Sequence, residues 1–194
     1  MSAWNTPSFL FPKKRPGEYR LVQDFRPQNA ATITDGHPLP RINNILRTQG
    51  QKEMWTVLDL KDGYHQMPLN PEHRHITCMS TPRGTMQWKT QVMGLKNAAA
   101  QFQRMMEWAL RDIDEADPYI DDIIIGSTGR TRAELIANHN RDVFRVLETL
   151  ETHGLVCCPK QSHFFMTEVE FCGHILREGR RSPAPGKLLP IQKI

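Results

Sequence analysis

The sequence has little of what marks secreted, membrane-spanning or disulfide-stapled proteins. It contains 4 cysteines among 194 residues, and their spacing suits no disulfide framework. No apolar run reaches the ~18 residues that a membrane helix needs, and no signal peptide is recognisable. We therefore expect an intracellular protein, cytoplasmic or particle-associated, with reduced thiols and no membrane partner. The sequence does not predict the oligomeric state.

The charge balance of the chain excludes few classes of binding partner. The chain carries 25 Lys and Arg against 21 Asp and Glu, a net charge of +4. A mildly basic chain is compatible with a polyanionic partner but does not establish one. There is no internal repeat, low-complexity tract or clear linker, and the length is enough for one sizeable domain.

One group of residues superficially suggests zinc. Five potential zinc ligands lie near the C-terminus: Cys157, Cys158, His163, Cys172 and His174. Their spacing matches no usual zinc finger, and Cys172 falls inside an apolar strand pattern. We do not expect a zinc site.

The most informative pattern is an acid pair between hydrophobic residues. Asp121 and Asp122 follow Tyr119–Ile120 and precede the β-branched run Ile123–Ile125. Two adjacent carboxylates in a β-rich core lose water and repel each other. We expect a hairpin in which Tyr119–Ile120 end one strand and Ile123–Ile125 begin the next. The turn would then hold both acids, and a cation would offset their charge.

A third acid completes this hypothesis. The segment 55–60 is typical of a mostly buried strand, and Asp59 lies near its end. Mg²⁺ prefers hard oxygen ligands and takes the rest of its shell from water and substrate phosphates. Two such ions ~3.5–4 Å apart can activate a hydroxyl and stabilise a leaving oxygen in phosphoryl transfer. Asp59, Asp121 and Asp122 are therefore the candidate metal ligands.

The remaining pattern predicts an α+β fold. We expect helices from Pro40 to about Thr48, from an Asn97 cap to about Asp112, and from a Thr131–Glu134 capping box to His153. Expected strands lie at 19–24, 55–60, 76–80 and 85–90, with two or three more between 155 and 176. The helices would pack against a mixed, mostly antiparallel sheet.

The sequence resembles reverse transcriptases of gypsy-like LTR retrotransposons and retroviral Pol polyproteins. Tyr119–Asp122 resembles their aromatic-x-Asp-Asp box, and Leu58–Gln66 resembles the preceding Leu-Asp-Leu box. Three further segments match in order: Tyr19–Asn29 the fingers box, Gly94–Ala98 with Phe102-Gln103 the intermediate box, and Val169–His174 the primer grip. The likeness covers nearly the whole chain.

The resemblance implies a right-hand polymerase palm with fingers. Residues 1–194 would form one reverse transcriptase domain fragment, with about 1–50 and 85–96 as fingers and the rest as palm, and with the primer grip near 169–176. The thumb, connection and RNase H segments would lie outside these residues. The implied activity is that of an RNA-directed DNA polymerase, which transfers dNTPs to a primer 3′-OH on an RNA or DNA template with two Mg²⁺ ions, or Mn²⁺ as a substitute.

The resemblance also assigns roles to single residues. It makes Asp59, Asp121 and Asp122 the catalytic, metal-binding acids. It places the incoming nucleotide against Lys13 or Lys14, Arg20, Leu60, Met93 and Gly94, with Tyr64 as a steric gate against ribonucleotides. It places the primer grip at Phe171, Cys172 and Gly173.

Two alternatives remain open. Ala99 stands where the family usually has proline, and Met93 stands where many relatives carry an aromatic residue or Gln. Such departures are compatible with a catalytically inactive remnant that acts at most as a nucleic-acid-binding module. A nucleotidyl cyclase shares the acid pattern, but it predicts none of the fingers or primer-grip boxes.

Overall fold

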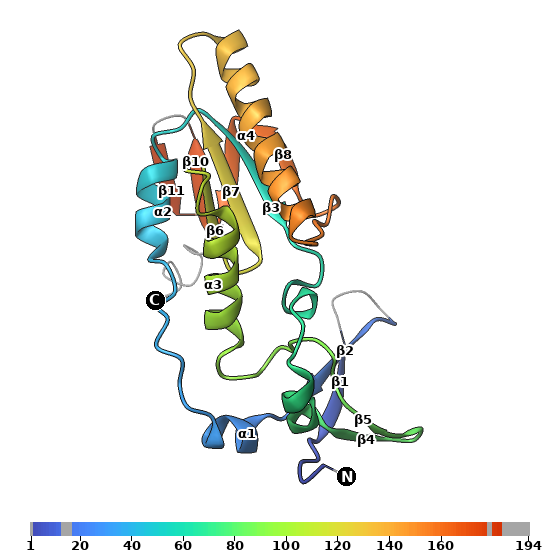
Figure 1. Ribbon diagram of the computed structural model, residues 1–194. Coiled ribbons are helices and arrows are strands. Elements are labelled where there is room, and N and C mark those ends of the chain that lie inside the picture. The colour runs from blue at the N-terminus through green and yellow to red at the C-terminus, as the bar shows by residue number, and fades with distance from the viewer. Residues whose placement is uncertain (1, 13–16, 178–179, 184–194) are drawn as a thin grey trace, which may run out of the picture. The chain divides into compact units, whose positions relative to one another are not determined.

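The computed structural model of the protein describes residues 2–12, 17–177 and 180–183 (Figure 1). These residues group into two compact units. The first contains the residues up to His37 together with Asp62–Phe102. The second contains Pro38–Lys61 and the residues from Gln103 onward.

The first unit begins with a two-stranded antiparallel ribbon. Strand β1 (Ser8–Pro12) pairs with β2 (Tyr19–Gln23), which confirms the strand predicted at 19–24. The short helix α1 (Arg26–Ala31) follows. It starts with a proline in its first turn, where the missing N–H costs nothing. The sequence did not predict α1, because six residues without apolar periodicity give no helical signal.

The rest of this unit is made of short elements. These are η1 (Gly63–Gln66), η2 (Pro71–Thr77), β4 (Met79–Thr81) and β5 (Gly84–Met86). The predicted strand pair at 76–80 and 85–90 is present as β4 and β5 but is shorter. Ile76 and Thr77 belong to η2, whose first turn is capped by the Asn70 side chain accepting from the Glu72 N–H at 3.1 Å.

The second unit is built on a four-stranded sheet. Its strand order is β6-β7-β3-β8, and every neighbouring pair is antiparallel. The strands are β3 (Met54–Asp59), β6 (Ala116–Tyr119), β7 (Asp122–Ser127) and β8 (His163–Met166). The two central strands, β3 and β7, are buried along most of their length. Their sequences are nearly continuous hydrophobic runs because both faces of these strands are covered.

A second, smaller sheet follows in the chain. It has the order β11-β10-β9 and contains β9 (Glu168–Phe171), β10 (His174–Arg177) and β11 (Arg180–Pro183). The sequence predicted two or three strands after residue 155, and the structure has β8, β9 and β10 there before β11. The mostly antiparallel pairing expected from the sequence is confirmed, and every pair among the described strands is antiparallel.

Three helices belong wholly or partly to this unit: α2 (Ile42–Gln49), α3 (Ala98–Leu110) and α4 (Arg132–Thr152). One core cluster joins α2, the central strands and the small sheet. Its members are Ile45, Leu46, Trp55, Val57, Ile124, Val169, Phe171 and Leu176. Because side chains alternate along a strand, Thr56 lies on the opposite face of β3, where it contacts α4.

Helix α4 starts as the capping box predicted. Thr131 Oγ1 accepts a hydrogen bond from the Glu134 N–H at 3.1 Å. The Glu134 carboxylate reaches back to the Arg130 N–H at 3.1 Å, one residue before the usual partner. The helix has 21 residues, about six turns, and ends at His153 followed by Gly154 with φ +69°, a left-handed stop that suits glycine.

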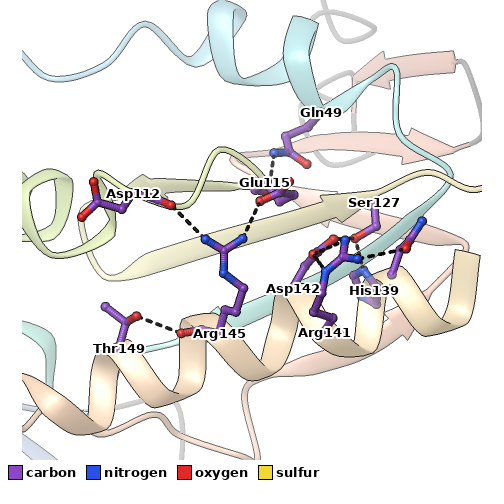
Figure 2. A network of polar contacts seen from close by, with 10 residues as sticks. Gln49, Asp112, Glu115, Ser127, His139, Arg141, Asp142, Arg145 and Thr149 are labelled. Carbon is purple, nitrogen blue, oxygen red and sulfur yellow. Dashed lines mark hydrogen bonds and ion pairs between the residues drawn. The ribbon is translucent and has the colours of Figure 1, made fainter.

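A buried polar network joins α4 to the sheet (Figure 2). His139 Nε2 lies 2.8 Å from Thr56 Oγ1, and His139 Nδ1 lies 2.9 Å from Ser127 Oγ. Ser127 donates to Asp142 Oδ2 at 2.7 Å, while Arg141 Nη2 lies 3.0 Å from Asp142 Oδ1. Since Ser127 gives its proton to Asp142, it accepts from His139 Nδ1–H, and His139 Nε2 accepts from Thr56. Burial lowers the pKa of His139 to about 4, against the opposing effect of Asp142, so the ring is neutral at pH 7.

Candidate active site

Two of the three candidate acids face each other across the central strands. Asp59 is the last residue of β3, Asp122 is the first of β7, and the two are direct partners in the antiparallel register. Directly opposed residues point to the same face of a sheet, with Cβ atoms about 4.5–5.5 Å apart. Like charges in such a pair destabilise the sheet, so this position requires a compensating proton or cation.

Asp121 lies in the turn that joins β6 to β7. Its carbonyl oxygen accepts a hydrogen bond from the Leu60 N–H at 2.9 Å, so the turn is fastened to the residue after Asp59. The prediction that the turn holds both acids is wrong for Asp122. Tyr119 pairs with Asp122, and the two-residue turn is therefore Ile120-Asp121. Asp122 belongs to the strand, where it faces Asp59.

The turn has an unusual backbone. Ile120 has φ +57°, in the left-handed region that a β-branched residue rarely adopts. Such a conformation costs of order 1–3 kcal/mol and persists only where the surroundings enforce it.

Gln103 on α3 holds the turn in this conformation. Its side chain is fully buried, and it bonds to the hairpin on both sides of the turn. Gln103 Nε2 donates to the Pro118 carbonyl at 3.0 Å, and Gln103 Oε1 accepts from the Ile120 N–H at 2.7 Å. Gln103 was recognised in the sequence only as part of a motif, and its contacts give it a role in shaping the acid-bearing turn.

The acids are poised to bind a proton or a cation. Burial raises the pKa of Asp122 to about 6, and the negative charges of Asp121 and then Asp59 add to the shift. Burial also raises the pKa of Asp59, with a smaller contribution from Asp121. The carboxylates of Asp59 and Asp122 are therefore destabilised in their charged forms by burial and by the neighbouring acids.

A segment after α4 also borders the site. Leu60 and Cys157 form an isolated antiparallel bridge, and the Lys61 N–H donates to the Val156 carbonyl at 2.9 Å. Burial, followed by the charges of Asp59 and Cys158, raises the pKa of the Cys157 thiol. Cys157 is therefore a neutral neighbour of Asp59, and all four cysteines are free thiols.

The carboxylates do not form a complete metal cage by themselves. Within the residues that the structure describes, no group of three or more His, Cys, Asp or Glu side chains is arranged to hold a metal ion. Carboxylate oxygens are hard donors that suit Mg²⁺, which usually completes its shell with water and substrate phosphates.

The predicted nucleotide-site residues belong to both units. In the first unit, Tyr64 in η1 packs edge-on against Phe102, with ring centroids 5.5 Å apart. Arg20 is exposed on β2, and its Nη1 lies 4.0 Å from the Met93 sulfur. In the second unit, the Leu60 side chain is buried, and its backbone N–H contacts the acid turn.

Gly94 has a clear conformational reason to be glycine. Its φ is +99°, and an added Cβ would lie 3.4 Å from the Phe25 ring. Its carbonyl accepts from Asn29 Nδ2 at 2.8 Å. This segment of the first unit is therefore tightly held. Lys13 and Lys14 lie outside the described residues.

The predicted primer grip is a tight hairpin. Cys172 and Gly173 join β9 to β10, with φ +48° and +71°, a pattern typical of a type I′ turn. Phe171 is 2% exposed and packs in the core cluster. Phe171 therefore anchors the hairpin, and the turn itself presents mainly backbone.

No described helix is long and apolar enough to cross a membrane.

Comparisons with known proteins concern the chain as a whole. The sequence matches the family described as "Reverse transcriptase (RNA-dependent DNA polymerase)" over residues 11–176. It is 35% identical to the retrovirus-related Pol polyprotein from transposon opus of Drosophila melanogaster, over 100% of this chain and 19% of that protein. It is 33% identical to the enzymatic polyprotein of figwort mosaic virus, over 97% of this chain and 28% of that protein. The chain thus spans less than a third of either polyprotein.

The fold has solved counterparts. A foamy viral protease-reverse transcriptase in complex with double-stranded DNA superposes with a TM-score of 0.88 at 24% identity, over 100% of this chain and 33% of that chain. A foamy viral protease-reverse transcriptase in complex with an RNA/DNA hybrid gives a TM-score of 0.85 at 23% identity, over 100% of this chain and 25% of that chain. At these identities the likeness concerns the fold alone, and it confirms the predicted palm and fingers architecture.

Proposed function

Because this chain belongs to the reverse transcriptase family of RNA-dependent DNA polymerases, we propose that it is the fingers and palm part of an RNA-directed DNA polymerase from a Pol polyprotein. The observation that carries the proposal is the acid arrangement. Asp59 faces Asp122 across two central strands, and the adjoining turn holds Asp121. In this family context, the opposed carboxylates of Asp59 and Asp122, whose pKa values are both raised, support a site for divalent metal together with the adjoining Asp121.

The proposed reaction joins a dNTP to a primer. The primer 3′-oxygen attacks the α-phosphorus, the bond to the β-phosphate oxygen breaks, and pyrophosphate leaves. Mg²⁺ bound at the carboxylates would supply Lewis-acid stabilisation of the attacking and leaving oxygens. Asp59 and Asp121 are the proposed main ligands, and Asp122 supports them. The raised pKa of Asp122 means that metal binding displaces a proton, so metal affinity should rise with pH.

Residues of the first unit are proposed to hold the nucleotide. Arg20 offers a fork of donors to the triphosphate, and Lys13 or Lys14 offers a point charge. Tyr64 is held edge-on by Phe102, which would give its ring the fixed position that a steric gate against a 2′-hydroxyl requires. Met93 and Gly94 would lie near the base, and the Leu60 backbone would line the sugar side.

The proposed partners are a primed RNA or DNA template and dNTPs. The turn formed by Cys172 and Gly173 would contact the primer through its backbone, with Phe171 as its anchor. Phosphate contacts dominate such binding. Affinity for primer–template should therefore fall steeply as salt rises.

A primer-extension assay tests this function. An RNA template with a DNA primer is incubated with dNTPs and Mg²⁺ at high protein and low salt, and Asp121→Asn is compared with the exposed neighbour Asp114→Asn. We expect synthesis that disappears with Asp121→Asn, survives Asp114→Asn, and stops in EDTA. Primer–template binding without synthesis by the unaltered chain would contradict the polymerase proposal and favour a nucleic-acid-binding remnant.

A further inference from the structure

A loop after α4 bonds to both main-chain polar groups of Asp59, its N–H and its carbonyl. The Asp59 N–H donates to Ser162 Oγ at 3.2 Å. The Ser162 hydroxyl donates in turn to the Cys158 carbonyl at 2.9 Å. The Cys158 N–H then donates to the Asp59 carbonyl at 2.7 Å. These three bonds close a ring, which we call the Asp59 clamp.

The clamp replaces strand pairing at the point where pairing stops. β8 begins at His163 and pairs with β3 at Val57 and Trp55, with a register shift between them. Regular pairing with β8 therefore ends before Asp59. A buried backbone N–H left without an acceptor costs free energy. The Ser162 side chain, 9% exposed, provides that acceptor.

The clamp also explains the local choice of residue at position 162. The backbone N–H groups of Gln161 and Ser162 already bond to the Cys158 carbonyl, at 3.0 and 3.1 Å. The turn at 158–162 is therefore closed without the hydroxyl. What the hydroxyl adds is the connection from that turn to the Asp59 amide. Alanine would keep the turn and lose the connection.

We propose that Ser162 is a positioning residue that sets the orientation of the Asp59 carboxylate toward Asp122 through the Asp59 main chain. This inference rests on the proposed metal-dependent function. Ser162 touches neither metal nor substrate in the proposal. Asp122 is held by strand pairing on both sides, to β3 and to β6, whereas Asp59 has strand pairing on the β7 side and the clamp on the other. Misplacement of a ligand by about 1 Å is enough to weaken such a site.

The test compares three variants of the full chain. Ser162→Ala removes the clamp, and Ser162→Thr retains a hydroxyl. Gln161→Ala is the matched control, because it alters the same loop at a side chain that bonds to Cys158 Sγ at 3.2 Å and leaves the clamp intact. Two measurements are made on each: the hydrogen-exchange rate of the Asp59 amide by NMR, and Mn²⁺ affinity by electron paramagnetic resonance, with Asp59→Asn defining the carboxylate site.

We expect Ser162→Ala to speed exchange of the Asp59 amide and to weaken Mn²⁺ binding roughly three- to tenfold, as loss of one hydrogen bond would. Gln161→Ala should leave both unchanged, and Ser162→Thr should restore most of the Mn²⁺ affinity. Faster exchange with unchanged Mn²⁺ affinity would show that Ser162 is only structural and would overturn the proposal. If the unaltered chain binds no Mn²⁺ at Asp59, the proposed metal site itself fails, and the positioning role fails with it.

Discussion

Replacement of Asp122 by asparagine should stabilise the metal-free fold even though it removes a proposed metal ligand. In the folded chain, burial and the neighbouring acids raise the pKa of Asp122 from 3.8 to about 6. A carboxyl group that binds protons more tightly in the folded state lowers the stability of the fold at pH values where it must ionise. The penalty is absent below about pH 4 and complete above about pH 6.

The size of the effect follows from the shift. One pKa unit corresponds to about 1.4 kcal/mol, so a shift from 3.8 to about 6 gives an upper bound of about 3 kcal/mol. Asp122 is only partly buried, and solvent screening reduces this figure. We expect Asp122→Asn to raise the free energy of unfolding by about 1 to 3 kcal/mol at pH 7.5.

Urea unfolding in EDTA measures the difference directly. The variant and the unaltered chain are compared at pH 7.5 and at pH 4, with Asp114→Asn as the control for an exposed acid. The difference should be present at pH 7.5 and should vanish at pH 4. Mg²⁺ should stabilise the unaltered chain more than the variant. A variant that is less stable at pH 7.5, or equally shifted at both pH values, would refute the reasoning.

Three further predictions concern residues around the site. Gln103→Leu leaves the Pro118 carbonyl and the Ile120 N–H unsatisfied, so it should cost about 2–4 kcal/mol in urea unfolding and abolish primer extension. Gln51→Leu, at an exposed glutamine, should do neither. Tyr64→Ala should raise ribonucleotide incorporation relative to dNTPs in primer extension, and an unchanged ratio would remove the gate role. The pKa of His139 is lowered from 6.5 to about 4 in the folded chain, so as pH falls the unfolded chain takes up a proton before the folded chain does. The free energy of unfolding should therefore drop by up to about 3 kcal/mol between about pH 6.5 and pH 4. The measurement is made by urea unfolding in the Asp122→Asn background, which removes the opposite slope of that carboxyl, and a flat profile would contradict a buried neutral His139.

Much of the fold could be predicted because several local signals agree with the final packing. The Thr131–Glu134 box starts α4, and α2 ends at Gln49, close to the predicted Thr48. Strand β3 is an apolar run with an acid at its end, as the sequence indicated. In these segments local propensity and tertiary burial favour the same structure, so the sequence is sufficient.

The acid turn could not be placed correctly from the sequence because a distant residue decides it. Local preference favours an aspartate in the left-handed position of a turn, yet Ile120 occupies it. Gln103 holds that conformation from a different helix. The Asp59 clamp could not be predicted for the same reason. Ser162 accepts a hydrogen bond from the Asp59 N–H, which lies 103 residues earlier in the chain, and no local sequence pattern indicates this contact.

The position of β3 at the centre of its sheet has a consequence for synthesis of the chain. Two of its hydrogen-bond partners come much later. Ser162, which accepts from the Asp59 N–H, follows Asp59 by 103 residues, and Phe165, whose N–H donates to the Thr56 hydroxyl, follows Thr56 by 109. At about 5–20 residues per second on the ribosome, β3 emerges roughly 5–20 s before those partners. During that time Met54, Trp55 and Val57 form a hydrophobic strand with an open edge, which favours pairing with other chains. Nascent chains that stop before Ser162 should therefore need a chaperone to remain unaggregated.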